Sequence, residues 1–171
     1  MPKYITPDRR FEVDGAVSAV TFLKAQHGTS TPTSPRPDSP SPSSSYKHRL
    51  RELLVWDAIA THTTSSLAPH HPAPEVAYCQ RGIRIDILGL PEIENHLPAA
   101  DAAATLRALL LQYPRLDLKR GMTECFCALA RSKPATTYDN IVGAFGEAYV
   151  EGYERLKVGE TMVVDSLRPD C

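Results

Sequence analysis

Apolar residues recur along this chain at the three- and four-residue spacing of an α-helix, and this periodicity most limits what the chain can fold into. The first apolar stripe runs through Val13, Ala16, Val17, Val20 and Leu23. Such spacing places these side chains on one face of a helix. Alternation of apolar and polar residues, which is typical of half-buried strands, forms no convincing run anywhere. We therefore expect an all-α fold and, since no heptad is sustained, an irregular helical bundle rather than a coiled coil.

The same periodicity predicts six helices. Their expected ranges are about 14–27, 46–63, 74–88, 99–113, 119–132 and 139–153. Asp14 is a typical N-cap for the first helix, and Gly28 is a typical stop signal after it. The third helix has proline in its first turn, where the missing N–H costs little.

A serine- and proline-rich tract interrupts the chain between the first two helices. Residues 29–46 contain five prolines among serines and threonines and almost nothing to bury. We expect this tract to be a disordered insert. The 171-residue length suits about one domain. We therefore predict a single partial domain over 1–153 that carries this insert, and a poorly ordered tail over 154–171.

Composition excludes several classes of protein. The net charge is −1, and no basic stripe indicates a nucleic-acid partner. No apolar run approaches the length of a membrane span, and the first residues lack the apolar core of a secretory signal. Cys125 and Cys127 are too close in sequence for a zinc knuckle, so we expect the cysteines to be small apolar residues in a reducing compartment. The expected location is the cytoplasm.

His62 ends an apolar row of the second predicted helix. The row comprises Leu50, Leu54, Ala58 and His62, at four-residue spacing, and hydroxyl side chains follow it. A histidine at such a place is either a satisfied helix-end residue or a group that handles protons or metal. The residue spacing leaves both interpretations open.

Asp86 continues the apolar stripe of the third predicted helix, after Val76, Cys79 and Ile83. A carboxylate on an apolar face must be paired, hydrogen-bonded, metal-bound or protonated, because an isolated buried charge is very costly. The simplest interpretation is a helix-end carboxylate that forms a salt bridge with Arg81 or Arg84. The alternative is a metal ligand.

Five segments of the chain resemble, in order and at similar spacing, the serial blocks of HD-domain proteins similar to cyanamide hydratase. They are RFEVDGA (10–16), VWDAIATHT (55–63), GIRIDILG (82–89), YPRL (113–116) and KPATTYDN (133–140). The resemblance touches most of residues 10–153. It implies an HD-like helical bundle and a divalent metal, zinc or iron, held by a histidine, an adjacent His-Asp pair and a later aspartate.

The resemblance assigns roles to two residues. Asp86 matches the later aspartate and is therefore the implied metal ligand. His62 matches a histidine close to the metal centre that contacts the substrate or the metal-bound water, and we take it as the candidate catalytic residue. In such proteins the metal lowers the pKa of a bound water towards about 7. The hydroxide then attacks the carbon of a small C≡N compound.

The chain departs from the family pattern at its start. The first histidine and the His-Asp pair precede the RFEVDGA-like block in such proteins, whereas 1–9 contain no histidine. We therefore expect an N-terminally incomplete HD domain that lacks its first helices. A catalytic metal needs about three protein ligands. Metal binding by this chain is thus expected to be weak or absent, and its status as an enzyme is open.

Three functions follow as expectations. The first is hydration of cyanamide, a nitrile or an isocyanide, in detoxification or secondary metabolism. The second is a catalytically inactive, truncated HD-like protein that acts as a binding or regulatory partner, because missing helices would leave apolar helix faces uncovered. The third is a metal-dependent phosphohydrolase. The expected partners are a small C≡N substrate and either a second copy or a full-length paralogue.

Overall fold

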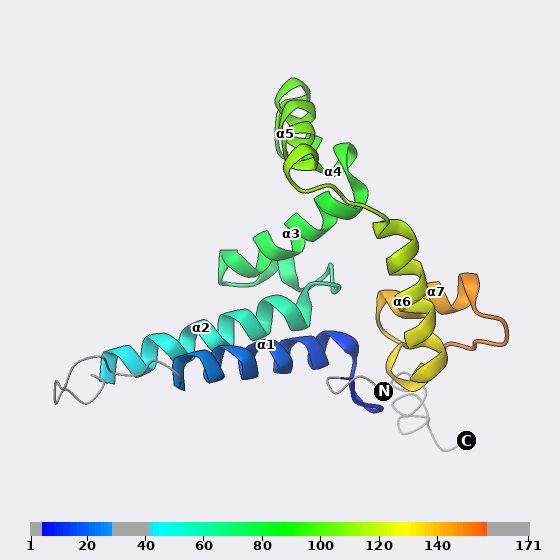
Figure 1. Ribbon diagram of the computed structural model, residues 1–171, viewed down its shortest axis with the longest axis horizontal. Coiled ribbons are helices and arrows are strands. Elements are labelled where there is room, and N and C mark those ends of the chain that lie inside the picture. Colours follow the sequence, from blue (N-terminus) through cyan, green and yellow to red (C-terminus); the bar gives the residue numbers. More distant parts are fainter. Residues whose placement is uncertain (1–4, 29–41, 157–171) are drawn as a thin grey trace, which may run out of the picture. The chain divides into compact units, whose positions relative to one another are not determined.

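The computed structural model describes residues 5–28 and 42–156, and all regular secondary structure in these ranges is helical (Figure 1). The α-helices are α1 (Phe11–Gly28), α2 (Pro42–Thr61), α3 (Pro74–Leu88), α4 (Leu90–Glu94), α5 (Ala99–Gln112), α6 (Leu118–Ser132) and α7 (Ile141–Tyr149). Two short 3-10 helices, η1 (Ala68–His70) and η2 (Pro134–Thr136), lie in the connections. The all-α fold class is thereby confirmed. None of the described helices is long and apolar enough to cross a bilayer.

The chain divides into two compact units. The first comprises Met1–Ile5 and Phe11–Pro114, and the second comprises Thr6–Arg10 and Arg115–Cys171. The expectation of one domain over 1–153, and its HD-like character, stay predictions.

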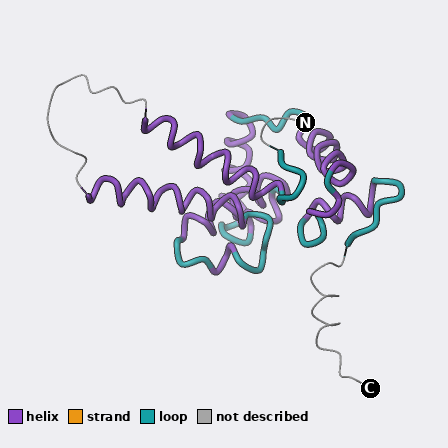
Figure 2. Tube along the Cα trace, turned by 90° about the horizontal axis from the view of Figure 1, so that it is seen from below, coloured by secondary structure: helices purple, strands orange, loops and turns teal. Residues whose placement is uncertain are grey.

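In the first unit α1 and α2 lie side by side (Figures 1 and 2). The helices approach closely at Gly15, because a Cβ atom at this position would lie 3.3 Å from Cγ2 of Ile59. The other side of α2 contacts α3, and α4 leads on to α5. The buried apolar side chains of this unit are few and mostly small: Ala16, Ala68, Val76, Ile93 and Ala102.

In the second unit α6 packs against α7 through an edge-to-face contact of Phe126 and Phe145, whose ring centroids are 5.0 Å apart. The residues after α7 turn back over that helix. Tyr153 packs on Gly146, where an added Cβ atom would lie 2.6 Å from the tyrosine ring. The hydroxyl groups of Tyr153 and Thr137 share a hydrogen bond of 2.5 Å. Glycine in α7 therefore makes room for the returning chain.

Several predicted boundaries are correct and others are wrong. The range 74–88 is reproduced without change, and α5 and α6 lie within a residue of their predicted ends. Helix α1 begins at Phe11, so Asp14 is a buried residue of its first turn and not its N-cap. Glu12 and Asp14 both suit that first turn because carboxylates stabilise the positive end of the helix dipole.

The Ser/Pro tract ends earlier than expected. Helix α2 already begins at Pro42, so the prediction of disorder is wrong for 42–46, while 29–41 lie outside the described residues. Proline at the first position of α2 is compatible with a helix because its missing N–H would have no partner there. Most of the expected tail, 157–171, also lies outside the described residues.

Substitution of Gly146 tests the packing of the second unit. We expect Gly146→Ala to lower the free energy of unfolding by about 1–3 kcal/mol, because the methyl group would overlap the Tyr153 ring. Gly121→Ala in α6 is the matched control, since its Cβ atom would meet nothing within 4 Å. Removal of a helical glycine at that open position should instead stabilise by about 0.5–1 kcal/mol. Urea denaturation of both variants measures the difference, and equal effects would contradict the packing described.

Candidate functional site

His62 lies directly after the last residue of α2, and its ring is held by a backbone carbonyl group. Its Nδ1 atom is 2.6 Å from the carbonyl oxygen of Ile59. A carbonyl oxygen can only accept a hydrogen bond, so Nδ1 must carry the proton. In the neutral ring Nε2 then carries the lone pair. His62 is thereby set up as a base or a metal ligand through Nε2, the arrangement found when the other nitrogen is tied to a carbonyl group.

Phe11, the first residue of α1, meets the His62 ring edge-to-face, with centroids 6.0 Å apart and planes at 81°. Both rings are half-buried. The ring of His62 is thus fixed by the carbonyl group of Ile59 and by Phe11. One contact comes from its own helix and the other from the neighbouring helix.

The residue after His62 forms a hydrogen bond with a buried carboxyl group of α1. The hydroxyl of Thr63 donates a hydrogen bond of 2.5 Å to Oε1 of Glu12, which is 1% exposed. Asp14 is buried in the same turn of α1. The start of α1 therefore buries two acidic side chains near His62. Sequence reasoning missed Glu12, although its place inside the RFEVDGA block was a signal that could have found it.

Asp86 lies in the last turn of α3, and its side chain is exposed. Burial fades along the expected stripe, since Val76 is fully buried whereas Cys79 and Ile83 are only half-buried. The premise that Asp86 sits on a buried face is therefore wrong. Exposure leaves the carboxylate hydrated, so its charge carries no large desolvation penalty.

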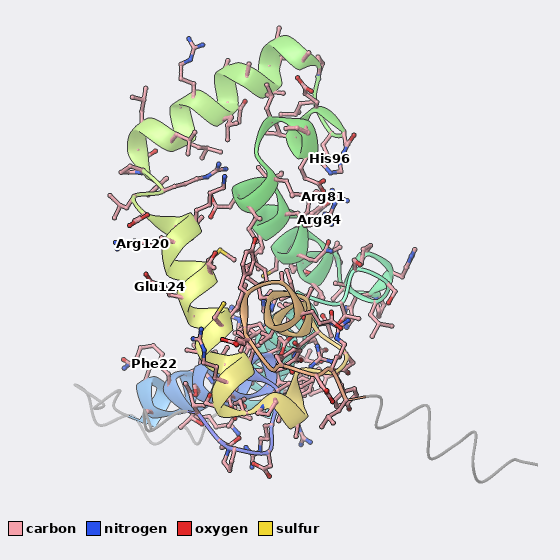
Figure 3. The ribbon with its side chains drawn as sticks, turned by 90° about the vertical axis from the view of Figure 1, so that its right-hand side faces the viewer. Phe22, Arg81, Arg84, His96, Arg120 and Glu124 are labelled. Carbon is pink, nitrogen blue, oxygen red and sulfur yellow. The ribbon has the colours of Figure 1, made fainter. Side chains whose placement is uncertain are left out.

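Arg84, one of the two arginines considered as a partner for Asp86, is engaged elsewhere. Its Nε and terminal nitrogen donate to the two carboxylate oxygens of Glu92 at 2.8 and 2.9 Å. This bidentate pair joins α3 to α4, and Figure 3 shows Arg81 and His96 near it. The hydrogen bonds from Arg84 hold the pKa of Glu92 below its usual range, and the charges of His96 and Arg81 act in the same direction. The pair raises the pKa of Arg84.

The residues available for the implied metal do not form a ligand set. Over 5–28 and 42–156 no three His, Cys, Asp or Glu side chains gather where they could hold an ion. Asp86 is the one implied ligand in this part of the chain, and it is a single exposed carboxylate. A zinc or iron centre needs about three protein donors at short distances. The described donor set therefore does not fit the metal centre that the resemblance implies.

Residues of the KPATTYDN block stabilise the second unit. Lys133 is 3% exposed, and its ammonium group donates to the carbonyl oxygen of Thr6 at 2.9 Å. Arg10 and Asp139 form an ion pair of 2.8 Å. The Asn140 side chain caps α7 by accepting from the amide of Val142. The block thus fixes residues 6–10 and begins α7, which accounts for its polar composition without a catalytic role.

Comparisons with protein-family models, with curated proteins and with solved structures give no match to this chain. The resemblance to HD-domain proteins therefore rests on the five sequence blocks alone.

Substitution of Thr63 tests the buried junction of α1 and α2. We expect Thr63→Val to lower the free energy of unfolding by about 1–3 kcal/mol, because it removes a hydrogen bond to a buried carboxyl group. Thr21→Val is the matched control, since the Thr21 hydroxyl is exposed and bonds only to the carbonyl of Val17 in its own helix. Chemical denaturation should show a change within about 0.5 kcal/mol for that control. Equal stability of both variants would show that the Glu12–Thr63 bond does not support the junction.

Proposed function

We propose that this chain is an HD-type protein similar to cyanamide hydratase, and that it contributes to the addition of water to a small C≡N compound. The observation that carries the proposal is the hydrogen bond between Nδ1 of His62 and the carbonyl of Ile59, which leaves Nε2 of the neutral ring as the basic nitrogen. The five blocks in family order support the same assignment.

His62 would act as the proton-transfer group. Nε2 accepts a proton from the water as its oxygen bonds to the carbon of the C≡N group. The resulting imidazolium then returns a proton to the nitrogen. With cyanamide this step gives isourea, and the histidine ends in its starting state. Isourea becomes urea when its hydroxyl proton moves to the imino nitrogen. A positioned general base of this kind contributes typically about 10²–10⁴-fold to a rate.

We expect the divalent metal that the resemblance implies to bind this chain weakly or not at all, because the described donor set does not fit it. The proton transfer proposed above therefore uses His62 and no metal. Asp86 stays the residue that the resemblance assigns as a metal ligand.

The test measures metal content and urea formation with purified full-length chain, cyanamide and excess zinc or iron(II). We expect His62→Ala to lower kcat by about 10²–10⁴-fold, and Asp86→Asn to leave the metal content unchanged, because one exposed carboxylate cannot hold a zinc or iron ion by itself. His70→Ala, an exposed histidine of η1, is the control and should change neither quantity. Absence of turnover at saturating metal, or equal rates in all variants, would overturn the hydratase proposal.

A second candidate function is favoured by the surface of the described residues. Large apolar side chains are exposed on α1, α2 and α5, among them Phe22, Leu50, Leu53 and Leu111, and in the turn before α6 at Leu116. Apolar patches of this kind mark surfaces that bind other molecules. We therefore also propose that the chain binds another polypeptide, with or without catalysis of its own.

A further inference from the structure

An exposed apolar stripe runs along the N-terminal half of α2. It comprises Tyr46, Leu50, Leu53 and Trp56, which are 64%, 46%, 52% and 37% exposed. The first three are spaced by four and three residues, so they form one straight row on the helix surface, and Trp56 lies beside its end. This spacing is the one by which a helix offers anchors to a second helix.

The described neighbours of α2 do not cover the stripe. Helix α1 covers one side of α2, and the salt bridge between Lys24 and Glu52, 3.7 Å long, crosses that contact. In both ribbon views the ends formed by the start of α2 and the end of α1 extend beyond the other described helices of the first unit (Figures 1 and 2). The described residues therefore leave the stripe open to a partner.

Basic side chains flank the stripe on both sides. Helix geometry places Lys47 and Arg51 along one side and Arg49 along the other, and all three are exposed. A partner helix that lays apolar residues on the stripe brings its own flanking residues next to these charges. Acidic flanks would be attracted, whereas basic flanks would be repelled.

We propose that this stripe, defined by Tyr46, Leu50, Leu53 and Trp56, is a docking site for an amphipathic helix of another polypeptide that carries glutamate or aspartate beside its apolar face. The inference deepens the second function proposed above by naming the chemistry of the partner. It does not depend on hydratase activity.

The flanking charges argue against a second copy of this chain as the occupant. In a parallel twofold pair of α2 stripes the same residues of both copies would meet. Lys47 and Arg49 of one copy would then face basic residues of the other. Like charges next to each other at such a seam lower affinity, so an acidic helix fits the site better than a parallel second copy.

The experiment uses two synthetic helical peptides of about 20 residues, with leucines at the spacing of a helix face. One carries glutamate beside the leucines and the other carries lysine. Fluorescence anisotropy measures the binding of each to the full-length chain without metal or nitrile. We expect the acidic peptide to bind at least about tenfold more tightly than the basic one, with an affinity that falls as salt rises.

Two variants of the chain complete the design. Lys47→Glu with Arg49→Glu should reverse the preference in favour of the basic peptide. Leu50→Gln with Leu53→Gln should abolish binding of both. All four positions are exposed, so circular dichroism is expected to show unchanged helix content.

Equal binding of the two peptides, or binding that neither variant changes, would overturn the proposal. Self-association that is lost in the Leu50/Leu53 variant would overturn it in favour of a second copy. Binding to phosphatidylserine vesicles with no binding of the acidic peptide would overturn it in favour of a membrane surface. Because no readout involves turnover, failure of this proposal is distinguishable from failure of the hydratase proposal.

Discussion

The first unit depends on the close packing of α1 against α2. Glycine at position 15 lets the two helices approach so closely that an added methyl group would press against Ile59. At the end of the same contact a buried carboxyl group of α1, Glu12, accepts a hydrogen bond from Thr63, which follows α2. A small residue and a buried polar bond are both sensitive to distance, so together they fix how the two helices lie.

The orientation of the His62 ring depends in part on that packing, whereas its tautomer is set within α2. The ring lies between the last turn of α2, which accepts its Nδ1 proton, and Phe11 at the start of α1. A shift of α1 would remove the aromatic contact and leave only the carbonyl group to orient the ring. The basic nitrogen at the centre of the proposed proton transfer thus follows from the carbonyl group of Ile59, and the packing of α1 only holds the ring in place. The Glu12–Thr63 bond acts on His62 through position alone.

Sequence periodicity predicted α3, α5 and α6 well because each of them has an apolar face, and it reproduced α3 without change. It failed where burial depends on a neighbouring element. Asp86 continues the helical spacing that begins at Val76, yet its carboxylate is exposed whereas Val76 is buried. Glu12 is acidic and stands in a first helical turn, where exposure is the usual expectation, but the approach of α2 buries it. The five-residue α4 is too short to produce a periodic signal.

The candidate site was predictable in part. His62 was identified from the row it shares with Ala58, and its identity as a helix-end histidine was one of the two interpretations considered. Its tautomer could not be predicted, because that depends on which carbonyl oxygen lies next to Nδ1. The exposed stripe of α2 was foreseeable as an uncovered apolar face. The acidic character of its partner could not be predicted from the sequence, because it depends on the exposed fraction of each side chain and on the basic residues that flank the stripe.

His62 holds its proton on Nδ1 and offers Nε2, and this tautomer can be measured. Long-range ¹H–¹⁵N correlation NMR on histidine-labelled protein, with His62→Asn to assign the signal, measures this tautomer directly at a pH where the ring is neutral. We expect the Nδ1–H form, with Nε2 showing the chemical shift of an unprotonated nitrogen. A dominant Nε2–H form would contradict it, because the hydrogen bond to Ile59 could not then exist and the proposed base would be absent.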